Sequence, residues 1–398
     1  MILLYILAFF IASVVLFFAY IRIKYRFWAV QPVVHFYDIY YWFVDAGIIE
    51  KDLPIKNKYY DPTIKTILFE DVDQNKLTKV INLIHLNYIF NKEYRENKFI
   101  PKEENISSYF IGHNSKCYWS FYYEPKLIQD TKSNDIVEQD YLVTIMTSRP
   151  LHVEITKPNI KMDIYYIDYL CVDKSQRKKG LAPKMIQTHE YNQRHANKEI
   201  HVSLFKREDE LTGIIPLCAY DTYGFKIAKW REPQELPAQY KFLLCDAQNM
   251  YYLMDFININ KSLFEIHIIS ELGNIVELVK TQNIYIYMLM EETTICSAYF
   301  FRKSCTYVEK GEEVLSCIAS LNVLSSEKMF IHGFKIAFWK IKEKYEDYKY
   351  LIVEKISHNN IIIKDLVKKT HPLISKTAYF FYNFAYRTFE SDKVFILC

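Results

Sequence analysis

Glycine is scarce in this chain. Only 8 of its 398 residues are glycine, against an average usage of about 7%, so a glycine inside a turn is informative. The eight cysteines include no C-x-x-C pair, and their spacing suits neither a zinc site nor a disulfide framework. We predict that most are buried, reduced thiols in a reducing compartment. They are Cys117, Cys171, Cys218, Cys245, Cys296, Cys305, Cys317 and Cys398.

The chain also lacks a strong excess of charge. Its formal net charge is +3, which is too small to indicate nucleic acid as the main partner. His189, His195 and His201 form no H-E-x-x-H motif. They are expected to be ordinary polar residues on a helix and a strand, and no metal site is predicted.

What the chain has in abundance is apolar and aromatic side chains. Of its residues, 51% are hydrophobic and 17% are aromatic, which predicts a large packed core and excludes general disorder. The length suits two or three domains of about 150 residues each. The surplus of Ile, Lys, Asn and Tyr is typical of an AT-rich coding sequence, as in a large DNA virus or a protist.

The first segment is apolar and long. Residues 2–21 carry no charge, and Arg22, Lys24 and Arg26 follow at once. About twenty apolar residues span a bilayer as a helix, and cations beyond its end place the body in the cytoplasm. A cleaved signal peptide and a buried soluble helix are the alternatives. We interpret residues 1–24 as a single-pass anchor in a host or viral membrane.

A strand, a basic turn and a helix start follow one another near the middle of the chain. Residues 163–172 are rich in β-branched and aromatic side chains and predict a buried strand. The turn Arg177-x-x-Gly180-x-Ala182 comes next, and Pro183 suits the first turn of a helix. Such a turn aims backbone N–H groups and a helix dipole at one point, which favours phosphate binding. A solvated basic loop is the alternative.

Hydrophobic periodicity predicts further elements. Helices are expected at 73–94, 183–197, 326–345 and 358–369. Strands are expected at 108–111, 117–122, 141–146, 199–205, 283–290, 298–302, 314–321, 350–354 and 379–384. Pro233 and Pro237 lie in a segment that we interpret as a domain boundary.

Several blocks resemble one known family. The turn has the R/Q-x-x-G-x-G/A pattern of the GNAT acyltransferases. Phe27-Trp28-x-x-Gln31-Pro32-Val33, Asp168-Tyr169-Leu170-Cys171-Val172, Phe380-Phe381-Tyr382-Asn383-Phe384 and Lys393-Val394 occur in the order found in protein N-myristoyltransferases. Because the blocks are independent and correctly ordered, the chain resembles this family of the GNAT superfamily.

The resemblance implies an α/β fold, a tandem pair of GNAT-like acyltransferase domains behind the N-terminal helix. The expected organisation is an anchor at 1–24, an acyl-CoA-binding domain at 25–230 and a peptide-binding domain at 231–398. It also implies a reaction, the transfer of a myristoyl group from myristoyl-CoA to the N-terminal glycine amine of a protein. Myristoyl-CoA would be a co-substrate, no cofactor would be bound permanently, and the enzyme would act as a monomer.

In this family two backbone N–H groups stabilise the oxyanion, and by position these are the amides of Tyr169 and Leu170. The base is the carboxylate of the last residue, here Cys398, although the tail is one residue shorter than in many members. No acyl-enzyme forms. Ser203 and Tyr220 are expected to contact the acceptor peptide. The expected acyl-CoA contacts are Arg26, Phe27, Trp28, Leu170, Cys171, Val172, Lys178, Gly180, Leu181 and Ala182.

Two substitutions in the turn separate this chain from the family pattern. Lys178 replaces the usual serine and Gly180 replaces an arginine, so the loop is closer to a general GNAT loop. Two other functions therefore stay open from the sequence. One is a GNAT-type N-acetyltransferase, and the other is an acyl-CoA- or lipopeptide-binding protein whose catalytic tail has decayed.

Overall fold

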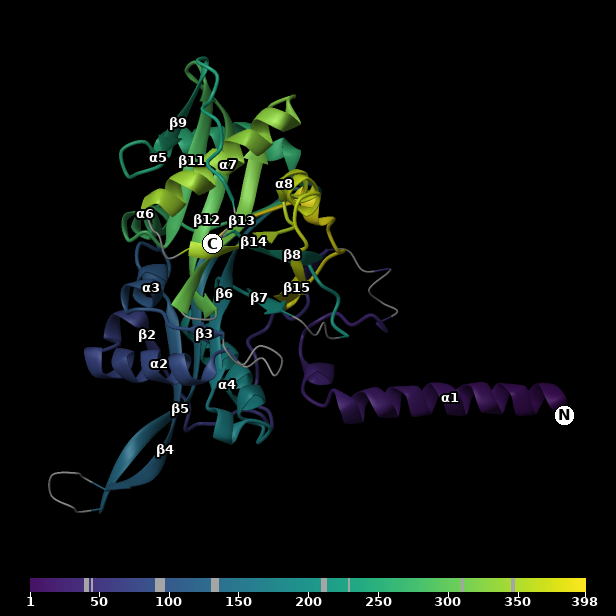
Figure 1. Cartoon of the computed structure of the whole chain (residues 1–398). Helices are drawn as coiled ribbons and strands as arrows, with labels where there is room; N and C mark the ends of the chain where they lie inside the picture. The colour runs from purple at the N-terminus through teal and green to yellow at the C-terminus, as the bar shows by residue number, and fades with distance from the viewer. Residues whose placement is uncertain are drawn as a thin grey trace.

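The computed structural model describes residues 1–38, 43, 46–89, 97–129, 136–208, 213–227, 230–308, 311–344 and 348–398. The chain contains both helices and strands, which form a mixed α/β body from which one long helix projects (Figure 1). The predicted α/β class is confirmed.

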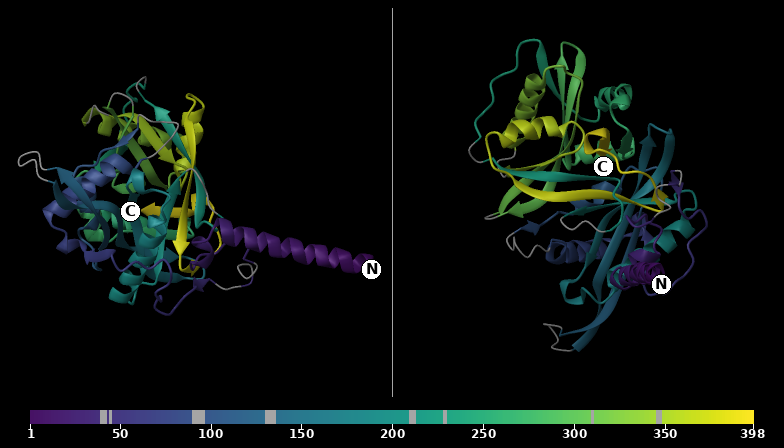
Figure 2. Two further views of the ribbon diagram at one scale, coloured as in Figure 1. Left: turned by 90° about the horizontal axis from the view of Figure 1, so that it is seen from below. Right: turned by 90° about the vertical axis from the view of Figure 1, so that its right-hand side faces the viewer.

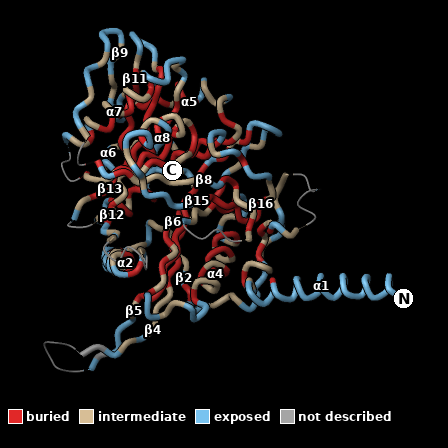
Figure 3. The backbone as a smooth tube through the Cα atoms, turned by 45° about the vertical axis from the view of Figure 1, so that its right-hand side comes forward, coloured by how far each residue is buried: buried red, intermediate tan, exposed pale blue. Residues whose placement is uncertain are grey.

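The projecting helix is α1, Ile2–Lys24. It points away from the body (Figure 2) and is exposed along its length except at Ile21 (Figure 3). At its end, the ring of Phe18 lies 6.3 Å from that of Tyr37. Its length and composition are sufficient to cross a membrane, and a signal sequence near an N-terminus has the same properties.

The first half of the body is built around a parallel strand–helix–strand unit. An antiparallel meander of β4 (Tyr118–Gln129), β5 (Ile136–Ile155) and β6 (Ile160–Val172) leads into helix α4 (Leu181–Ala196). Strand β7 (Val202–Glu208) then pairs in parallel with β6. The predicted strand and helix are confirmed, although α4 begins two residues before Pro183.

The second half repeats this arrangement. The meander β11 (Ile284–Glu291), β12 (Thr294–Val308) and β13 (Glu312–Asn322) is followed by helix α7 (Glu327–Lys344). Strand β14 (Tyr348–Glu354) then pairs in parallel with β13. The two halves therefore have the same strand–helix–strand unit, as expected for a tandem GNAT-like pair.

One sheet joins the halves. Among the described residues it has fifteen strands, most in the order β17-β10-β5-β6-β7-β15-β8-β14-β13-β12-β11-β9. Strands β8 (Cys218–Lys226) and β15 (Leu373–Tyr382) lie between the two units. Strands β10 (Ile266–Ile269) and β17 (Val394–Leu397) cross over to pair beside β5. The end of the chain thus lies in the middle of the molecule (Figure 1). The predicted domain boundary between residues 230 and 231 stays a prediction.

The remaining elements cover the sheet or extend it. Strand β4 pairs with β2, strand β12 with β3, and the two-residue strands β1 and β16 pair with each other. These elements are α2 (Gln74–Asn87), α3 (Glu104–Ser107), α5 (Met250–Ile259), α6 (Leu272–Lys280), α8 (Asn359–Val367), β1 (Gly47–Ile48), β2 (Lys65–Leu68), β3 (Lys98–Phe99), β9 (Tyr240–Leu244) and β16 (Phe384–Ala385).

One sequence-based prediction is wrong, and two predicted helices end outside the described residues. The segment predicted as a strand at 108–111 is a 3₁₀ helix over Ser108–Phe110, because its backbone continues the turn begun by α3. Helices α5 and α6 were not predicted. Helix α2 ends at Asn87, and the last predicted positions of that helix, 90–94, lie outside the described residues. The last position of the helix predicted at 326–345 also lies outside them.

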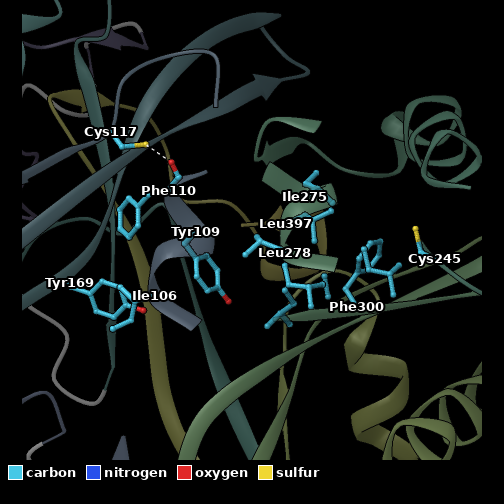
Figure 4. Packing of buried hydrophobic residues seen from close by; sticks show 14 of the residues in the cluster. Ile106, Tyr109, Phe110, Cys117, Tyr169, Cys245, Ile275, Leu278, Phe300 and Leu397 are labelled. Carbon is cyan, nitrogen blue, oxygen red and sulfur yellow. Dashed lines mark hydrogen bonds between the residues drawn. The ribbon is translucent and has the colours of Figure 1, made fainter. Parts of the chain in front are cut away.

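The largest hydrophobic cluster spans both halves. Its buried members include Tyr109 and Tyr169 from the first half and Leu278, Phe300 and Leu397 from the second (Figure 4). All eight cysteines lie in the described part of the chain, and each is a free, buried thiol. The predicted burial of the thiols is confirmed.

Candidate active site

Strand β6 is distorted where the predicted oxyanion residues lie. Its pairing with β5 shifts between Met146↔Leu170 and Ser148↔Ile167, so two residues of β6 face one residue of β5, which is a β-bulge. Its parallel pairing with β7 ends at Ile167↔Phe205. Beyond Ile167, β6 therefore has no paired β7 residue. The unpaired side of β6, which points away from β5, is called the opening between the two strands below.

The bulge gives the two predicted oxyanion amides different environments. The Asp173 N–H donates to the Val143 carbonyl at 2.9 Å. Since N–H groups alternate in direction along an antiparallel strand, the Leu170 N–H points away from β5, into the opening. The Tyr169 N–H instead donates to Thr147 Oγ1 at 3.1 Å. Of the two amides, only that of Leu170 points away from both β5 and the Thr147 hydroxyl, and an oxyanion role for either amide stays a prediction.

The chain end lies next to this bulge. Strand β17 runs parallel to β10, which pairs antiparallel to β5, so that Leu397, Ile269 and His152 form one row across the sheet. Cys398 follows and is only 3% exposed. Its thiol lies within electrostatic range of Asp168, the first residue of the bulge. The tail is buried, as its apolar sequence predicts.

A group of buried and partly buried charges lies within electrostatic range of Cys398. The Arg149 side chain is 0% exposed, and its Nε donates to Asp168 Oδ2. Glu354 Oε1 lies 2.9 Å from Lys206 Nζ and 3.7 Å from Arg302 Nη2. Burial raises the pKa of Glu354, but these two cations outweigh it, so the pKa is lowered and the carboxylate stays ionised.

Of the two residues predicted to contact the acceptor peptide, only Tyr220 belongs to this charged group. Its hydroxyl donates to Glu354 Oε2. The Ser203 hydroxyl donates instead to Glu190 Oε2 on α4 at 3.5 Å. Because Ser203 and Lys206 are three residues apart on β7, their side chains lie on opposite faces of the sheet. Lys206 is therefore the β7 residue beside Tyr220, while acceptor contact by Ser203 stays a prediction.

Sequence reasoning missed five charged residues of this group, namely Arg149, Asp168, Lys206, Arg302 and Glu354. A signal was present, because Arg149, Asp168 and Glu354 each interrupt an apolar strand. A charge on a buried strand is costly unless it is paired, so it points to a partner elsewhere in the chain. The identity of the partner, however, depends on strand order.

The basic turn has a backbone suited to anion binding. Lys178 and Gly180 both adopt left-handed conformations, with φ of 67° and 80°. Helix α4 begins at Leu181 with no side-chain cap, so the first amides, including that of Ala182, lack intrahelical partners. A Cβ on Gly180 would meet no atom within 4 Å. Glycine is therefore favoured there by the left-handed backbone conformation and not by a lack of room for a side chain.

Arg177 of the same turn has a structural contact. Its guanidinium donates to the Val172 carbonyl at 3.3 Å and to the Asn87 carbonyl at the end of α2. It thereby fixes the turn to the strand that precedes it. Lys184, one turn into α4, pairs with Asp61 at 3.0 Å.

Helix α4 is held against the sheet by a buried polar network. The two ring nitrogens of His189 lie 2.7 Å from Ser120 Oγ and 2.9 Å from Ser148 Oγ. Burial lowers the pKa of His189 to about 4, so its ring is neutral at physiological pH. The network joins α4 to β4 and β5, and so fixes the direction of the helix start.

Two of the resembling blocks, 27–33 and 380–384, meet in space. Trp28 stacks on Phe205 with ring centroids 5.7 Å apart, and Phe205 stacks on Phe380 at 5.2 Å. Gln31 Nε2 donates to Gln187 Oε1 on α4, and Gln31 Oε1 accepts from the Tyr382 hydroxyl at 2.6 Å. Segment 25–33 therefore lies along α4 and β15.

The predicted acyl-CoA contacts in segment 25–33 differ in exposure. Arg26 is exposed, and Phe27 is buried between the rings of Trp28 and Tyr59, at 5.0 and 5.2 Å. A cation at the surface beside a ring cluster suits a ligand that has an anionic end and an apolar chain.

Two surface hollows lie at the other end of the sheet, by β9 and β11. One, of about 480 Å³, is lined by Phe242, Leu244, Tyr287, Lys340, Glu343 and Lys344. The other shares Leu244 and Lys344 with it. Neither includes a predicted site residue.

Comparison with known proteins identifies the fold. The family model described as "Myristoyl-CoA:protein N-myristoyltransferase, N-terminal domain" matches residues 57–218. No curated protein matches the chain in sequence. The chain resembles solved structures of N-myristoyltransferase from Saccharomyces cerevisiae with bound myristoyl-CoA. One is 14% identical and covers 92% of this chain and 89% of that chain, with a TM-score of 0.69.

Two further structures of the yeast protein give similar values. A second with bound myristoyl-CoA has 14% identity, coverages of 92% and 94%, and a TM-score of 0.68. A third, with bound myristoyl-CoA and inhibitors, has 14% identity, coverages of 92% and 91%, and a TM-score of 0.67. The resemblance predicted from the sequence blocks is therefore confirmed for residues 57–218 by sequence and for the whole body by fold.

Proposed function

We propose that this chain, which has the N-terminal domain of the N-myristoyltransferases at residues 57–218 and the fold of the yeast enzyme, transfers a myristoyl group. The domain and the fold are those of an acyltransferase. The donor would be myristoyl-CoA, and the acceptor would be the N-terminal glycine amine of a protein. The enzyme would act as a monomer, and myristoyl-CoA would be its co-substrate.

The chain's own residues can perform each step. The left-handed turn at Lys178 and Gly180 and the start of α4 would hold the diphosphate of CoA. This would place the thioester carbonyl at the opening between β6 and β7. The Leu170 N–H, which faces the opening, would donate to the carbonyl oxygen as it gains negative charge.

The acceptor amine would attack the thioester carbon directly. A C–N bond forms and the C–S bond breaks, and the second proton of the amine passes to the leaving sulfur, so that CoA departs as the thiol. The ammonium form of the acceptor must first lose a proton, which the terminal carboxylate of Cys398 would accept. No side-chain nucleophile takes part, which agrees with the burial of all eight thiols.

One observation supports this proposal most strongly. The bulge of β6, the end of its pairing with β7 and the terminus of the chain all occur at one place in the fold. The first two would provide a backbone donor to the thioester oxygen, and the third would provide a carboxylate on the residue whose thiol lies within electrostatic range of Asp168. An acyl transfer by direct attack requires both groups at the same carbonyl.

The test is mass spectrometry of acceptor peptides. The full-length protein is incubated with a glycine-starting peptide, its alanine-starting twin, and equal amounts of acetyl-, lauroyl-, myristoyl- and palmitoyl-CoA. We expect a myristoyl amide on the glycine peptide alone. An acetylated product would indicate a GNAT-type acetyltransferase. Binding of acyl-CoA without any product would indicate a binding protein.

We further propose that α1 anchors the enzyme through residues 2–21, with the body in the cytoplasm. Arg22, Lys24 and Arg26 follow the apolar run, as expected for the cytoplasmic end of a span. One acyl chain gives only marginal membrane binding, so an anchored enzyme would release its product where it must insert.

Deletion of residues 1–24 tests this role. We expect the truncated protein to leave the membrane fraction but to acylate soluble peptides about as fast as the full chain, because the site lies in the body. Co-sedimentation with vesicles and peptide kinetics measure the two properties. Loss of activity, in a protein that still folds by circular dichroism, would count against a pure anchoring role.

A further inference from the structure

A side chain of β5 replaces a backbone acceptor at the bulge of β6. Thr147 faces the two bulge residues, Asp168 and Tyr169. The Thr147 side chain is buried, and its Oγ1 accepts the hydrogen bond from the Tyr169 N–H at 3.1 Å. A buried N–H without an acceptor is unfavourable. The threonine hydroxyl therefore supplies, at this position, what a regular strand pair would supply from a carbonyl.

The other bulge residue is held by a second side chain of β5. Arg149 lies two residues along β5 from Thr147 and so has its side chain on the same face of the sheet. It is fully buried, and its Nε donates to Asp168 Oδ2. The rings of Tyr109 and Tyr166 lie 5.3 and 5.1 Å from its guanidinium carbon. Each of the two bulge residues thus has one polar contact from β5.

The position of the bulge decides the direction of the Leu170 N–H. The register of β6 against β5 differs by one residue on the two sides of the bulge. Since N–H groups alternate in direction along an antiparallel strand, this difference reverses which N–H groups of β6 point toward β5. If the register of the earlier part of β6 continued through Leu170, its N–H would point toward β5, and the opening would lose this donor.

We propose that Thr147 and Arg149 are positioning residues that fix the bulge at Asp168 and Tyr169, and thereby direct the Leu170 N–H into the opening. Neither side chain touches the substrate in this role. The catalytic consequence rests on the proposed function, because it requires the Leu170 N–H to donate to the thioester oxygen. The hold on the bulge does not require it, and can be measured without turnover.

The test compares the same exchange at two threonines of β5. Thr147→Val keeps the shape of the side chain but removes the acceptor of the Tyr169 N–H, and Thr147→Ser keeps the hydroxyl. Thr144→Val is the matched control, since Thr144 is also buried on β5 and its hydroxyl has no hydrogen-bond partner within the described part of the chain. Hydrogen exchange of single amides is followed in the full-length protein in detergent, by mass spectrometry with electron-transfer fragmentation.

We expect the Tyr169 amide to exchange about tenfold faster in Thr147→Val than in the wild type, the effect of losing one hydrogen bond. It should exchange as in the wild type in Thr147→Ser and Thr144→Val. The amides of β13 and β14, in the other half of the body, are controls for general unfolding. Wild-type exchange of Tyr169 in Thr147→Val would overturn the role of Thr147. If that variant exchanges fast throughout, Thr147→Ala decides by the same criterion.

The contribution of Arg149 is measured with the same reporter. Arg149→Met leaves the Asp168 carboxylate without its partner, and the double variant Arg149→Met/Asp168→Asn also removes that charge. If the pair helps to fix the bulge, the Tyr169 amide exchanges several-fold faster in both variants. Wild-type exchange in the double variant would mean that Arg149 only neutralises Asp168, and its positioning role would be wrong.

Kinetics then link the bulge to catalysis. In Thr147→Val we expect kcat to fall by about a hundredfold, since a misplacement of about 1 Å can have this effect, with an unchanged KM for myristoyl-CoA. Thr147→Ser should restore kcat, and Thr144→Val should leave it unchanged. Faster Tyr169 exchange in Thr147→Val without any transfer by the wild type would support the hold on the bulge and contradict the proposed function. Transfer by the wild type with unchanged exchange in all variants would do the reverse.

Discussion

A chain extended by one glycine after Cys398 is expected to transfer acyl groups at least about a hundredfold more slowly than the wild type, the usual contribution of a general base. The reason is geometric. Cys398 is only 3% exposed, and one more residue moves the carboxylate by about 3.3 Å along the strand. KM for myristoyl-CoA should not change, because the turn before α4 is untouched. Steady-state kinetics with a glycine peptide measure both constants.

A second variant and a binding measurement make this result specific. Deleting Cys398 moves the carboxylate in the opposite direction, and the same loss of kcat is expected. Binding of a non-hydrolysable myristoyl-CoA analogue and the thermal unfolding temperature should match the wild type in both proteins. An extended chain with wild-type kcat would mean that the tail is not the base.

Replacing the amide of Leu170 by an ester is expected to lower kcat by about 10²–10³-fold, the effect of losing one oxyanion donor. The exchange removes one N–H and keeps the side chain. This N–H faces the opening between β6 and β7 rather than β5, so the strand pairing should persist. Nonsense suppression with the α-hydroxy acid of leucine provides the variant, and single-turnover kinetics measure the chemical step.

The matched control is the same exchange at Asp173. Its N–H donates to the Val143 carbonyl of β5 at 2.9 Å, directly after the end of β6. The ester there should lower stability by about 1 kcal/mol, as for one hydrogen bond, and leave kcat nearly unchanged. Equal losses of kcat at both positions would show that the Leu170 effect is structural.

The local elements of the site were predictable because local sequence decides them. Residues 163–172 form a strand because branched and aromatic side chains suit a pleated, buried surface. Gly180 marks the start of α4 because the backbone there has φ of 80°. Burial of the tail follows from its apolar run. Segment 108–111 was predicted wrongly because its apolar composition suits a strand and a short 3₁₀ helix equally.

The partners of the charged residues were not predictable in the same way. Lys206 and Glu354 are 148 residues apart in the chain, and their ion pair forms because both lie beside Tyr220 in the folded sheet. The alternation of side chains along β7 is a local rule, but the identity of the facing residue depends on which strand becomes the neighbour. Ser203 was predicted from the family resemblance, whereas the place of Lys206 in the charged group depends on the fold.

The sequence by itself determined the membrane-length helix, the strand–turn–helix unit with its left-handed turn, and the resemblance to the N-myristoyltransferases. Each follows from residues that are neighbours in the chain, since propensity, periodicity and turn conformation are short-range effects. Only the tertiary structure decided that the Leu170 amide faces the opening while the Tyr169 amide is bonded, and that Arg149 lies near the chain end. These depend on a bulge and on the crossing of β10 and β17 to β5, where strands distant in sequence must meet to bury their apolar faces.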